Sequence, residues 1–154
     1  MISFYLAVTD HDYAAAGLLF KEYAASIKIS LDFQHFDDEL EGLKKMYAEP
    51  YGGIILAKEE EEIIGCVAIR KISDYAGELK RMYIKTGRQN KGIGKILLNK
   101  ALQLAKNCNY TVVKLDTLNY MLPAIHLYKE AGFYETPPYY HNPISTAIYF
   151  EKVL

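Results

Sequence analysis

The sequence predicts an α/β fold in which helices flank one sheet. Short apolar and β-branched runs alternate along the chain with segments whose apolar residues recur at helical spacing. One glycine-containing turn, residues 87–94, leads directly from a predicted strand into a predicted helix. The chain has 154 residues, 51% of them hydrophobic, without an internal repeat, linker or low-complexity segment. These observations favour a single domain over residues 1–154.

The first third of the chain predicts one strand and two helices. Residues 2–8 are apolar and form a first strand candidate. Thr9 and Asp10 supply a helix N-cap signal, and apolar residues then recur at helical spacing from 13 to 27. The same spacing returns over residues 36–46, where three acidic residues favour a helix N-terminus. A second, shorter helix is expected there.

The middle of the chain predicts an antiparallel hairpin, a further strand and a helix. Residues 54–58 and 63–69 are apolar and β-branched, and the glutamates at 59–62 between them are typical of a solvated turn. Residues 78–84 predict another strand in this region. Residues 93–108 carry apolar side chains at helical spacing and predict the helix.

The last part of the chain predicts a strand, a helix and two closing strands. Residues 111–115 are a strand candidate, and 123–131 predict a short helix with proline near its first turn and glycine just past its end. Residues 133–135 and 144–153 are apolar enough to close the sheet. The proline-rich segment 137–143 between them is expected to be a loop or bulge, because proline cannot donate to a central ladder.

Charge and cysteine usage exclude several functional classes. Charged residues make up 24% of the chain and nearly cancel to a net charge of -1, so nucleic acid is not an expected partner. Cys66 and Cys108 lie in apolar stretches, which favours buried thiols and a cytoplasmic protein. Residues 1–8 lack a basic leader, and no apolar run approaches the roughly 20 residues of a membrane span. Histidines are scattered, so no metal is predicted.

The sharpest local signal is the strand-to-helix turn QNKGIGK, residues 89–95. Its glycines expose backbone N–H groups at a helix N-terminus, where unpaired donors and the helix dipole favour a phosphate. Lys91 and Lys95 add positive charge. The turn is not a P-loop because Ile96 stands where Ser or Thr is needed, and Leu97 replaces the small residue of a dinucleotide fingerprint. When this turn is considered alone, the alternative interpretation is an ordinary helix N-terminus that binds no ligand.

The wider context of this turn is a family pattern. The chain resembles the GNAT superfamily, the acetyl-coenzyme A-dependent N-acetyltransferases, whose signature Q/R-x-x-G-x-G/A is matched by Gln89, Gly92 and Gly94. A later Leu-Tyr before Gly-Phe, within residues 127–133, and the order of elements also agree. The resemblance implies a mixed central sheet of about six or seven strands flanked by about four helices. More narrowly, Glu-Leu-Lys-Arg at 78–81, Leu-Asp-Thr-Leu at 115–118 and the Pro-Tyr-Tyr-x-Asn-Pro loop resemble an uncharacterised bacterial branch.

The resemblance also implies where acetyl-coenzyme A binds. Family members bind the pantetheine arm through backbone groups of the strand before the signature, so that the cofactor continues the sheet. Met121 stands where many relatives carry asparagine, and Asn119 is out of register. Lys91 stands where many relatives carry arginine before the first glycine. It keeps the positive charge but lacks the two parallel N–H donors of a guanidinium. The implied cofactor-binding residues are Met82, Tyr83, Ile84, Gln89, Asn90, Lys91, Gly92, Ile93, Gly94 and Lys95.

The same resemblance implies a general base. A lysine-like amine has a pKa of about 10.4, some three units above pH 7, so forming the reactive free base at pH 7 costs roughly 4 kcal/mol. A general base or a desolvated site lowers this cost. Glu78 lies eleven residues before Gln89, the offset at which the histone-acetylating branch carries its base, and it would act through water. The alternative is a solvated glutamate or an ion-pair partner of Lys80 or Arg81.

Tyr128 is implied as the second group in proton transfer. It matches the tyrosine that many family members place beside the sulfur, where a phenol protonates or hydrogen-bonds the departing thiolate. A thiol has a pKa of only about 8.5, so its thiolate leaves fairly well without a proton donor. Losing Tyr128 should therefore slow the reaction and not abolish it. The alternative is simple burial on a helical face shared with Ala124, Leu127 and Ala131.

The predicted function is an N-acetyltransferase that moves an acetyl group from acetyl-coenzyme A to a primary amine of a small molecule or peptide. Direct transfer in a ternary complex is expected because neither cysteine is placed as a nucleophile. Candidate substrate-binding residues are Phe33, Phe36, Tyr139 and Tyr140, with packing as the alternative. The sequence does not predict which amine is the acceptor. A non-catalytic acyl-coenzyme A sensor or a dimerising structural module is the alternative function, and no residue specifies a homodimer.

Overall fold

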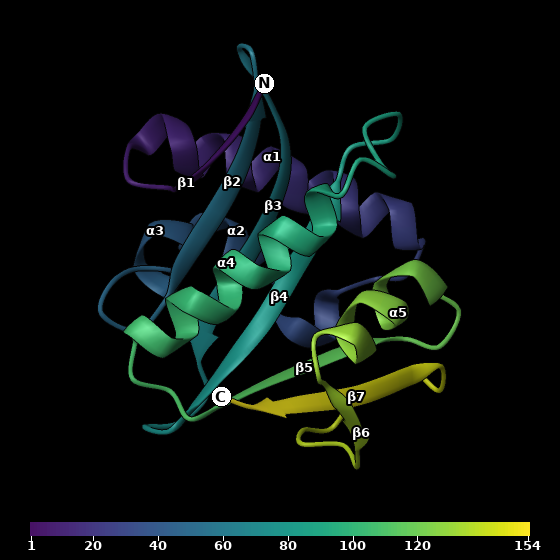
Figure 1. The fold of residues 1–154 in the computed structure, drawn as a ribbon. Helices are drawn as coiled ribbons and strands as arrows, with labels where there is room; N and C mark the ends of the chain where they lie inside the picture. The colour runs from purple at the N-terminus through teal and green to yellow at the C-terminus, as the bar shows by residue number, and fades with distance from the viewer.

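In the described part of the chain, seven strands form one mixed sheet at the centre of the molecule (Figure 1). The computed structural model describes residues 1–154 apart from the side chain of Phe33. The strand order is β1-β2-β3-β4-β5-β7-β6, and the predicted α/β fold is confirmed. The strands are β1 (Ile2–Leu6), β2 (Gly53–Glu59), β3 (Glu62–Lys71), β4 (Ala76–Ile84), β5 (Val112–Leu118), β6 (Tyr134–Thr136) and β7 (Ala147–Val153). The helices are α1 (Asp10–Ile27), the 3-10 turn η1 (Asp32–Gln34), α2 (Phe36–Glu41), α3 (Leu43–Met46), α4 (Ile93–Asn107) and α5 (Leu122–Glu130).

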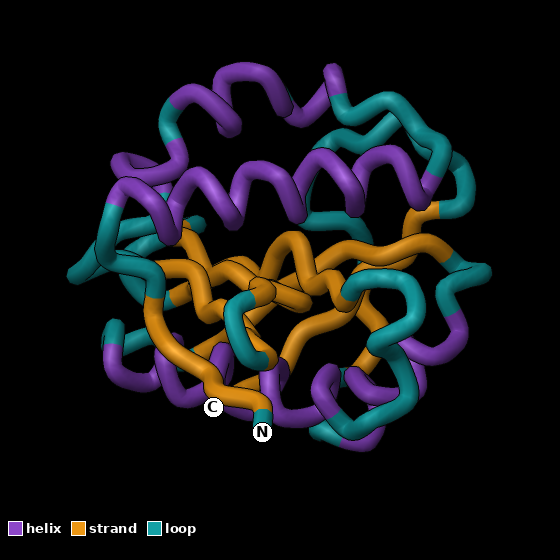
Figure 2. Tube along the Cα trace, turned by 90° about the horizontal axis from the view of Figure 1, so that it is seen from above, coloured by secondary structure: helices purple, strands orange, loops and turns teal.

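Helices cover both faces of this sheet (Figures 1 and 2). Helices α4 and α5 pack on one face, and α1 to α3 pack on the other. At the predicted spacing, α4 buries Ile93, Leu97 and Ala101. On the opposite face the ring of Phe20 meets Tyr47 edge-on, with centroids 5.9 Å apart. Each face of the sheet therefore has its own apolar core. The described helices are all too short or too polar for a transmembrane span.

The helices before β2 show one confirmed prediction and one error. Thr9 Oγ1 accepts a hydrogen bond from the N–H of Asp12, and the Asp12 carboxylate accepts one from the N–H of Thr9, each at 3.0 Å. This capping box starts α1 at the predicted place. The predicted single helix over 36–46 is wrong, because the chain leaves helical geometry at Gly42 (φ −115°) and forms two helices, α2 and α3. Glycine in a helix interior has the largest backbone entropy to lose.

Two strand ends differ from the prediction for reasons of pairing. Strand β7 begins at Ala147 and not at Ile144, because Asn142 Oδ1 accepts a hydrogen bond from the Ile144 N–H (2.9 Å) and holds a turn there. Strand β5 continues to Leu118, beyond its predicted end, because each of its residues pairs with β7. This pairing keeps Asp116, a poor strand former, inside the sheet.

Strands β4 and β5 diverge after a short contact. Parallel pairs join residues 76–78 of β4 to residues 112–114 of β5. Beyond Glu78 the described strands form no further β4–β5 pair, and the two ribbons separate visibly in Figure 1. Backbone groups on this edge of β4 are therefore left without a neighbouring strand, and the gap opens toward α5.

A bulge at Arg81 changes the direction of two β4 side chains. The β3–β4 register shifts between Cys66 and Ala68, and Arg81 has a φ of 58°, in the left-handed region that non-glycine residues adopt at a cost. The Cys66 thiol donates a hydrogen bond to the Arg81 carbonyl (3.2 Å). Strict alternation would put Lys80 and Arg81 on opposite faces, but both contact the Gln34 side chain, at 3.4 and 2.8 Å.

Candidate active site

A cavity of about 530 Å³ opens between the end of β4 and the first turns of α4 and α5. We call it the turn cavity, because the predicted phosphate-binding turn forms one wall. Residues of α5 and the residue before it form the opposite wall, among them Met121 and Leu127. Eight of the ten predicted cofactor-binding residues line this cavity: Met82, Ile84, Gln89, Asn90, Gly92, Ile93, Gly94 and Lys95.

Two glycines shape the turn in different ways. Gly92 is the N-cap of α4 with a φ of 76°, and a Cβ placed there would meet no described atom within 4 Å. At Gly94 a Cβ would lie 3.0 Å from Leu127 Cδ1, so a small residue is needed where α4 meets α5. Gln89 Nε2 donates a hydrogen bond to the Ile84 carbonyl (3.2 Å) and folds the turn back onto β4. The first N–H groups of α4, which lack intrahelical acceptors, therefore border an open space.

Two predicted cofactor-binding side chains lie elsewhere. Strand alternation turns Tyr83 to the other face of the sheet, where its ring meets Tyr23 edge-on with centroids 6.3 Å apart. Lys91 is exposed and is not among the described residues that line the turn cavity. Tyr83 can therefore reach a ligand in this cavity only through its backbone, and Lys91 only as a charge at the rim.

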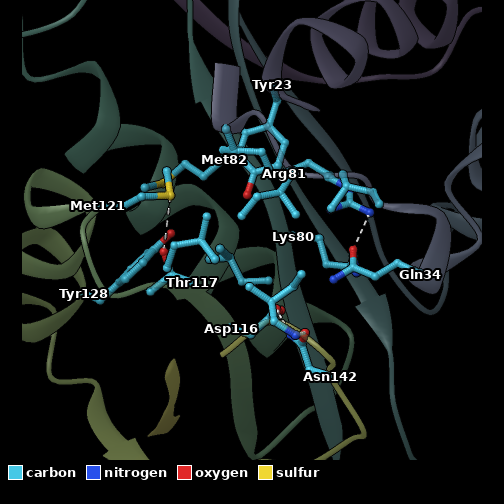
Figure 3. A pocket seen from close by; sticks show the side chains of 16 residues that line it. Tyr23, Gln34, Lys80, Arg81, Met82, Asp116, Thr117, Met121, Tyr128 and Asn142 are labelled. Carbon is cyan, nitrogen blue, oxygen red and sulfur yellow. Dashed lines mark hydrogen bonds between the residues drawn. The ribbon is translucent and has the colours of Figure 1, made fainter. Parts of the chain in front are cut away.

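A second, smaller cavity of about 50 Å³ lies where β4 and β5 diverge (Figure 3). We call it the inner cavity. In Figure 3, Tyr128 and Met121 lie on one side of it and Gln34 on the other, with Asp116 and Asn142 at its lower edge. Met82 and Met121 line both cavities, so the two meet at this pair.

Tyr128 combines a position in the core with one on a cavity wall. Its ring packs against Phe133 and Phe150, with centroids 5.8 and 6.4 Å away, so it belongs to the apolar core. The same residue also lines the inner cavity. Burial raises the pKa of the Tyr128 phenol above its ordinary value, so the group stays protonated at neutral pH. It is able to donate a hydrogen bond and is unable to act as a base there.

Glu78 is buried in an ion-paired environment. Arg70 Nε donates to its Oε1 at 2.7 Å, Lys80 Nζ lies 3.9 Å from the same oxygen, and the Tyr139 hydroxyl donates to Oε2 at 2.5 Å. Burial favours the neutral acid, but Lys80, Arg70 and Tyr139 together hold the pKa of Glu78 below its ordinary value. The ion-pair interpretation is thus confirmed for Lys80 and wrong for Arg81.

Arg81 pairs instead with Glu39 of α2. Arg81 Nη2 and Nε donate to the two Glu39 oxygens at 2.7 and 3.1 Å, and the Tyr47 hydroxyl donates to Glu39 at 2.8 Å. Burial would raise the pKa of Glu39, but the guanidinium holds it below its ordinary value. The pair is buried on both sides and ties α2 to the strained residue of β4.

The predicted substrate-binding residues have other contacts. The side chain of Phe33 lies outside the described part of the structure. The Phe36 ring lies 5.3 Å from the Arg81 guanidinium and packs against the core, so it supports that ion pair. Tyr139 and Tyr140 each donate a hydrogen bond to a carboxylate, the first to the buried Glu78 and the second to the half-buried Asp116. Both tyrosines and Glu78 line a third cavity, of about 530 Å³, whereas Asp116 lines the inner cavity.

Asp116 is the functional candidate that sequence reasoning missed. Its Oδ2 accepts hydrogen bonds from the Tyr140 hydroxyl (2.7 Å) and from Asn142 Nδ2 (3.5 Å), and it lines the inner cavity. Burial raises the pKa of Asp116, although Tyr140 and Lys80 oppose this. The available signal was a carboxylate inside an apolar strand, which is rare without a partner.

Comparison with known proteins identifies the family. The sequence profile described as the acetyltransferase (GNAT) family matches residues 5–133. The chain belongs to the GNAT family. It is 36% identical over 134 residues to an uncharacterised N-acetyltransferase of Schizosaccharomyces pombe, covering 86% of this chain and 82% of that protein. An uncharacterised N-acetyltransferase of Dictyostelium discoideum is 27% identical over 197 residues, covering 88% and 91%. This GNAT protein is therefore an acetyltransferase.

Solved structures share the fold. An acetyltransferase from Streptococcus agalactiae superposes with a TM-score of 0.81 at 20% identity, covering 99% of this chain and 98% of that one. A GNAT family acetyltransferase from Elizabethkingia anophelis, solved with acetyl-coenzyme A bound, gives a TM-score of 0.69 at 23% identity, covering 99% and 98%. The predicted GNAT fold is confirmed, with five α-helices in the described chain because the second predicted helix is divided.

Proposed function

We propose that this GNAT protein transfers the acetyl group of acetyl-coenzyme A to a primary amine of a small molecule or peptide, directly in a ternary complex. The observation that carries the proposal is the meeting of the two cavities at Met82 and Met121. A thioester entering through the turn cavity and an amine held in the inner cavity would meet in the gap between β4 and β5. Residues 1–154 would form the one catalytic domain.

The turn cavity has the groups that acetyl-coenzyme A needs. The open backbone at Gly92 and the N-terminus of α4 suit a pyrophosphate, and Lys95 on the same wall adds a positive charge. The edge of β4 beyond Glu78 has no β5 partner in the described chain, so Met82 and Ile84 can offer backbone groups to pantetheine amides. A solved protein of the same fold holds acetyl-coenzyme A, which supports this ligand for the proposed reaction.

Direct transfer is favoured over an acyl-enzyme by the state of the two thiols. Burial raises the pKa of the Cys66 thiol, which donates its proton to the Arg81 carbonyl in a hydrogen bond. Burial also raises the pKa of Cys108. Neither cysteine is among the described residues that line the turn cavity or the inner cavity. A thiol that stays protonated and lies away from the thioester is a poor nucleophile.

The reaction requires one group to remove protons from the amine and one to assist the thiolate. The amine lone pair attacks the thioester carbonyl, the C–N bond forms and the C–S bond breaks. We propose that the Tyr128 phenol donates to the leaving sulfur. Glu78 is the base proposed from its offset to the signature, acting through water, but Arg70 and Tyr139 already occupy its two oxygens. Tyr139 and Tyr140 would shape the acceptor end together with Phe36.

The location, partners and oligomeric state of the protein remain predictions from its sequence. Its near-neutral charge and its cysteines favour a cytoplasmic enzyme without nucleic-acid or membrane partners, and a homodimer is compatible with the fold. A bacterial origin was predicted from the narrower resemblance, while the two named relatives are from eukaryotes.

The first experiment measures acetyl-coenzyme A binding by isothermal titration. Gly92→Trp should abolish binding, because the new side chain would project into open space on the cavity wall. Gly87→Trp is the matched control, since Gly87 also has a positive φ (89°) and open surroundings but is not among the described residues of that wall. Absence of binding to the wild type would overturn the proposal.

A thiol-release screen then separates an enzyme from a sensor. The acceptors are n-butylamine, putrescine, glycine, L-lysine and a short peptide with a free N-terminus, each with acetyl-coenzyme A. Turnover with any of these amines supports the proposed reaction. Tight binding without turnover of any amine would favour the alternative, a non-catalytic acyl-coenzyme A sensor.

A further inference from the structure

We propose that Asp116 binds the ammonium group of the acceptor and takes the first proton from it. This inference rests on the proposed amine acetyltransfer and deepens it by naming a catalytic residue at the acceptor end. Asp116 lines the inner cavity together with Thr117, Met121 and Tyr128, and lies at its lower edge in Figure 3.

The strand register puts Asp116 nearer to the reaction point than Glu78. Parallel pairing sets Glu78 beside Lys114, and Asp116 follows two residues later, about 7 Å further toward the divergence of the strands. Met82, at the junction of the cavities, lies in the same direction along β4. Glu78 is not among the described residues that line the inner cavity.

Asp116 differs from the two buried carboxylates of this region, because it has no salt-bridge partner among the described residues. Glu39 pairs with Arg81 and Glu78 pairs with Arg70, each at 2.7 Å. Among the described residues, Asp116 has no cationic side chain within 4.0 Å, and its hydrogen bonds come from neutral donors. Asp116 is half-buried, and a carboxylate that is partly removed from water is stabilised when a positive partner approaches it. The ammonium of a bound acceptor would be that partner.

The surroundings of the two carboxylates also differ in their effect on basicity. Burial raises the pKa of Asp116, whereas the neighbouring cations and Tyr139 lower that of Glu78. A higher pKa makes a stronger base, and a pair of carboxyls with divergent pKa values is a common way to divide acid–base roles. Titratable groups from several elements act on Asp116. The charged ones belong to β4: Glu78, Lys80 and Arg81. The phenols belong to α1, α5, the loop after β6, and β7: Tyr23, Tyr128, Tyr139, Tyr140 and Tyr149.

The protons balance with Asp116 in this role. The first proton of the ammonium moves to the carboxylate, and the neutral nitrogen then attacks the thioester carbonyl carbon. The second proton leaves the nitrogen as the amide forms and reaches the departing thiolate, through the Tyr128 phenol in the proposed scheme. Asp116 later returns its proton to solvent. The sum is an ammonium and a thioester giving an amide, a free thiol and one proton.

The test compares Asp116→Asn with Glu78→Gln, using the amine that the wild type acetylates fastest in the screen. Asp116→Asn should lower kcat/KM for the amine about 100-fold to 1,000-fold at pH 7, and further than Glu78→Gln does. At pH values below the pKa of the amine, the kcat/KM of Asp116→Asn should rise about tenfold per pH unit, because only amine that is already neutral can react. Unchanged acetyl-coenzyme A titration would show that both variants remain folded.

The adjacent tyrosines provide a second, gentler pair of variants. Tyr140→Phe removes a hydrogen bond that stabilises the Asp116 carboxylate, and should move the acidic limb of kcat/KM to higher pH. Tyr139→Phe removes the equivalent bond from Glu78 and should leave the position of that limb unchanged. A role of Asp116 in structure alone would not move the limb.

Three outcomes would overturn parts of this scheme separately. Wild-type kcat/KM within threefold in Asp116→Asn would overturn the role of Asp116 and leave the acetyltransfer intact. If the acidic limb of kcat/KM shifts in Tyr139→Phe but not in Tyr140→Phe, the base is Glu78 and not Asp116. No turnover by the wild type with any amine would overturn the proposed function, and the role of Asp116 with it.

Discussion

The turn cavity and the inner cavity share two methionines but are built in opposite ways. The turn cavity takes most of its predicted residues from one continuous segment, 89–95, and its shape depends on the backbone at Gly92. The inner cavity combines side chains from α1, η1, β4, β5, α5 and the loop before β7. Its walls include the buried Lys80 and Arg81 of β4 and the half-buried Asp116 of β5.

This difference separates binding from stability. A substitution in the turn changes a locally built surface and should leave the two cores intact. A substitution around the inner cavity changes charges that also hold β4 to α2 and to the loop after β6. In the proposed scheme, acceptor binding is therefore coupled to the stability of the fold, while cofactor binding is not.

The largest effect should come from breaking the buried pair beside the inner cavity. Glu39→Gln removes the charge that compensates Arg81, and breaking a buried pair in this way costs about 3–5 kcal/mol in the free energy of unfolding. Urea denaturation measures this loss. Glu61→Gln is the matched control, because that glutamate is exposed and lies 3.7 Å from Lys58, so its stability should stay close to that of the wild type.

The same pair makes stability depend on pH in a defined direction. The pKa of Glu39 is lower in the folded chain than its ordinary value, so its contribution is present above about pH 4 and is lost as the pH falls through the folded value. Glu39→Gln should therefore lose less additional stability on acidification. Equal acid sensitivity of both proteins would show that this pair does not contribute as described.

A smaller effect should follow from the phenol at the junction. Tyr128→Phe keeps the ring that packs against Phe133 and Phe150, and should lower kcat about 10-fold to 100-fold with little change in KM for acetyl-coenzyme A. The reaction persists because a thiolate leaves well without help. Stopped thiol-release assays measure kcat, and Tyr134→Phe, whose hydroxyl is exposed and bonds Glu151, is the control. An unchanged kcat would assign Tyr128 to packing alone.

The smallest effects are expected at the rim of the turn. Lys95→Ala should raise KM for acetyl-coenzyme A about twofold to fivefold, and Lys91→Ala less, because Lys95 lines the cavity and Lys91 lies outside it. Added salt should reduce both differences through screening. Lys106→Ala, at the other end of α4, serves as the control. A larger loss in Lys91→Ala than in Lys95→Ala would reverse this order.

The proposed cofactor end of the site follows to a large extent from local sequence patterns. The turn, its glycines and the strand before it follow from local patterns, and eight predicted residues do line one cavity. The acceptor end could not be predicted in this way. Tyr139 and Tyr140 were identified by their position in a proline-rich loop, but the carboxylates they hold became visible only when the loop was placed beside β4 and β5.

The sequence by itself determined the order of strands and helices, because apolar periodicity and caps act between residues close together in the chain. It also determined the glycine turn, because the φ of 76° at Gly92 is a local requirement. Only the tertiary structure decided the partners of the buried charges. Arg81 and Glu39 are 42 residues apart, and Tyr140 and Asp116 are 24 apart. Packing selects such contacts among many chemically equivalent partners, so the acceptor side of the site exists only in the folded chain.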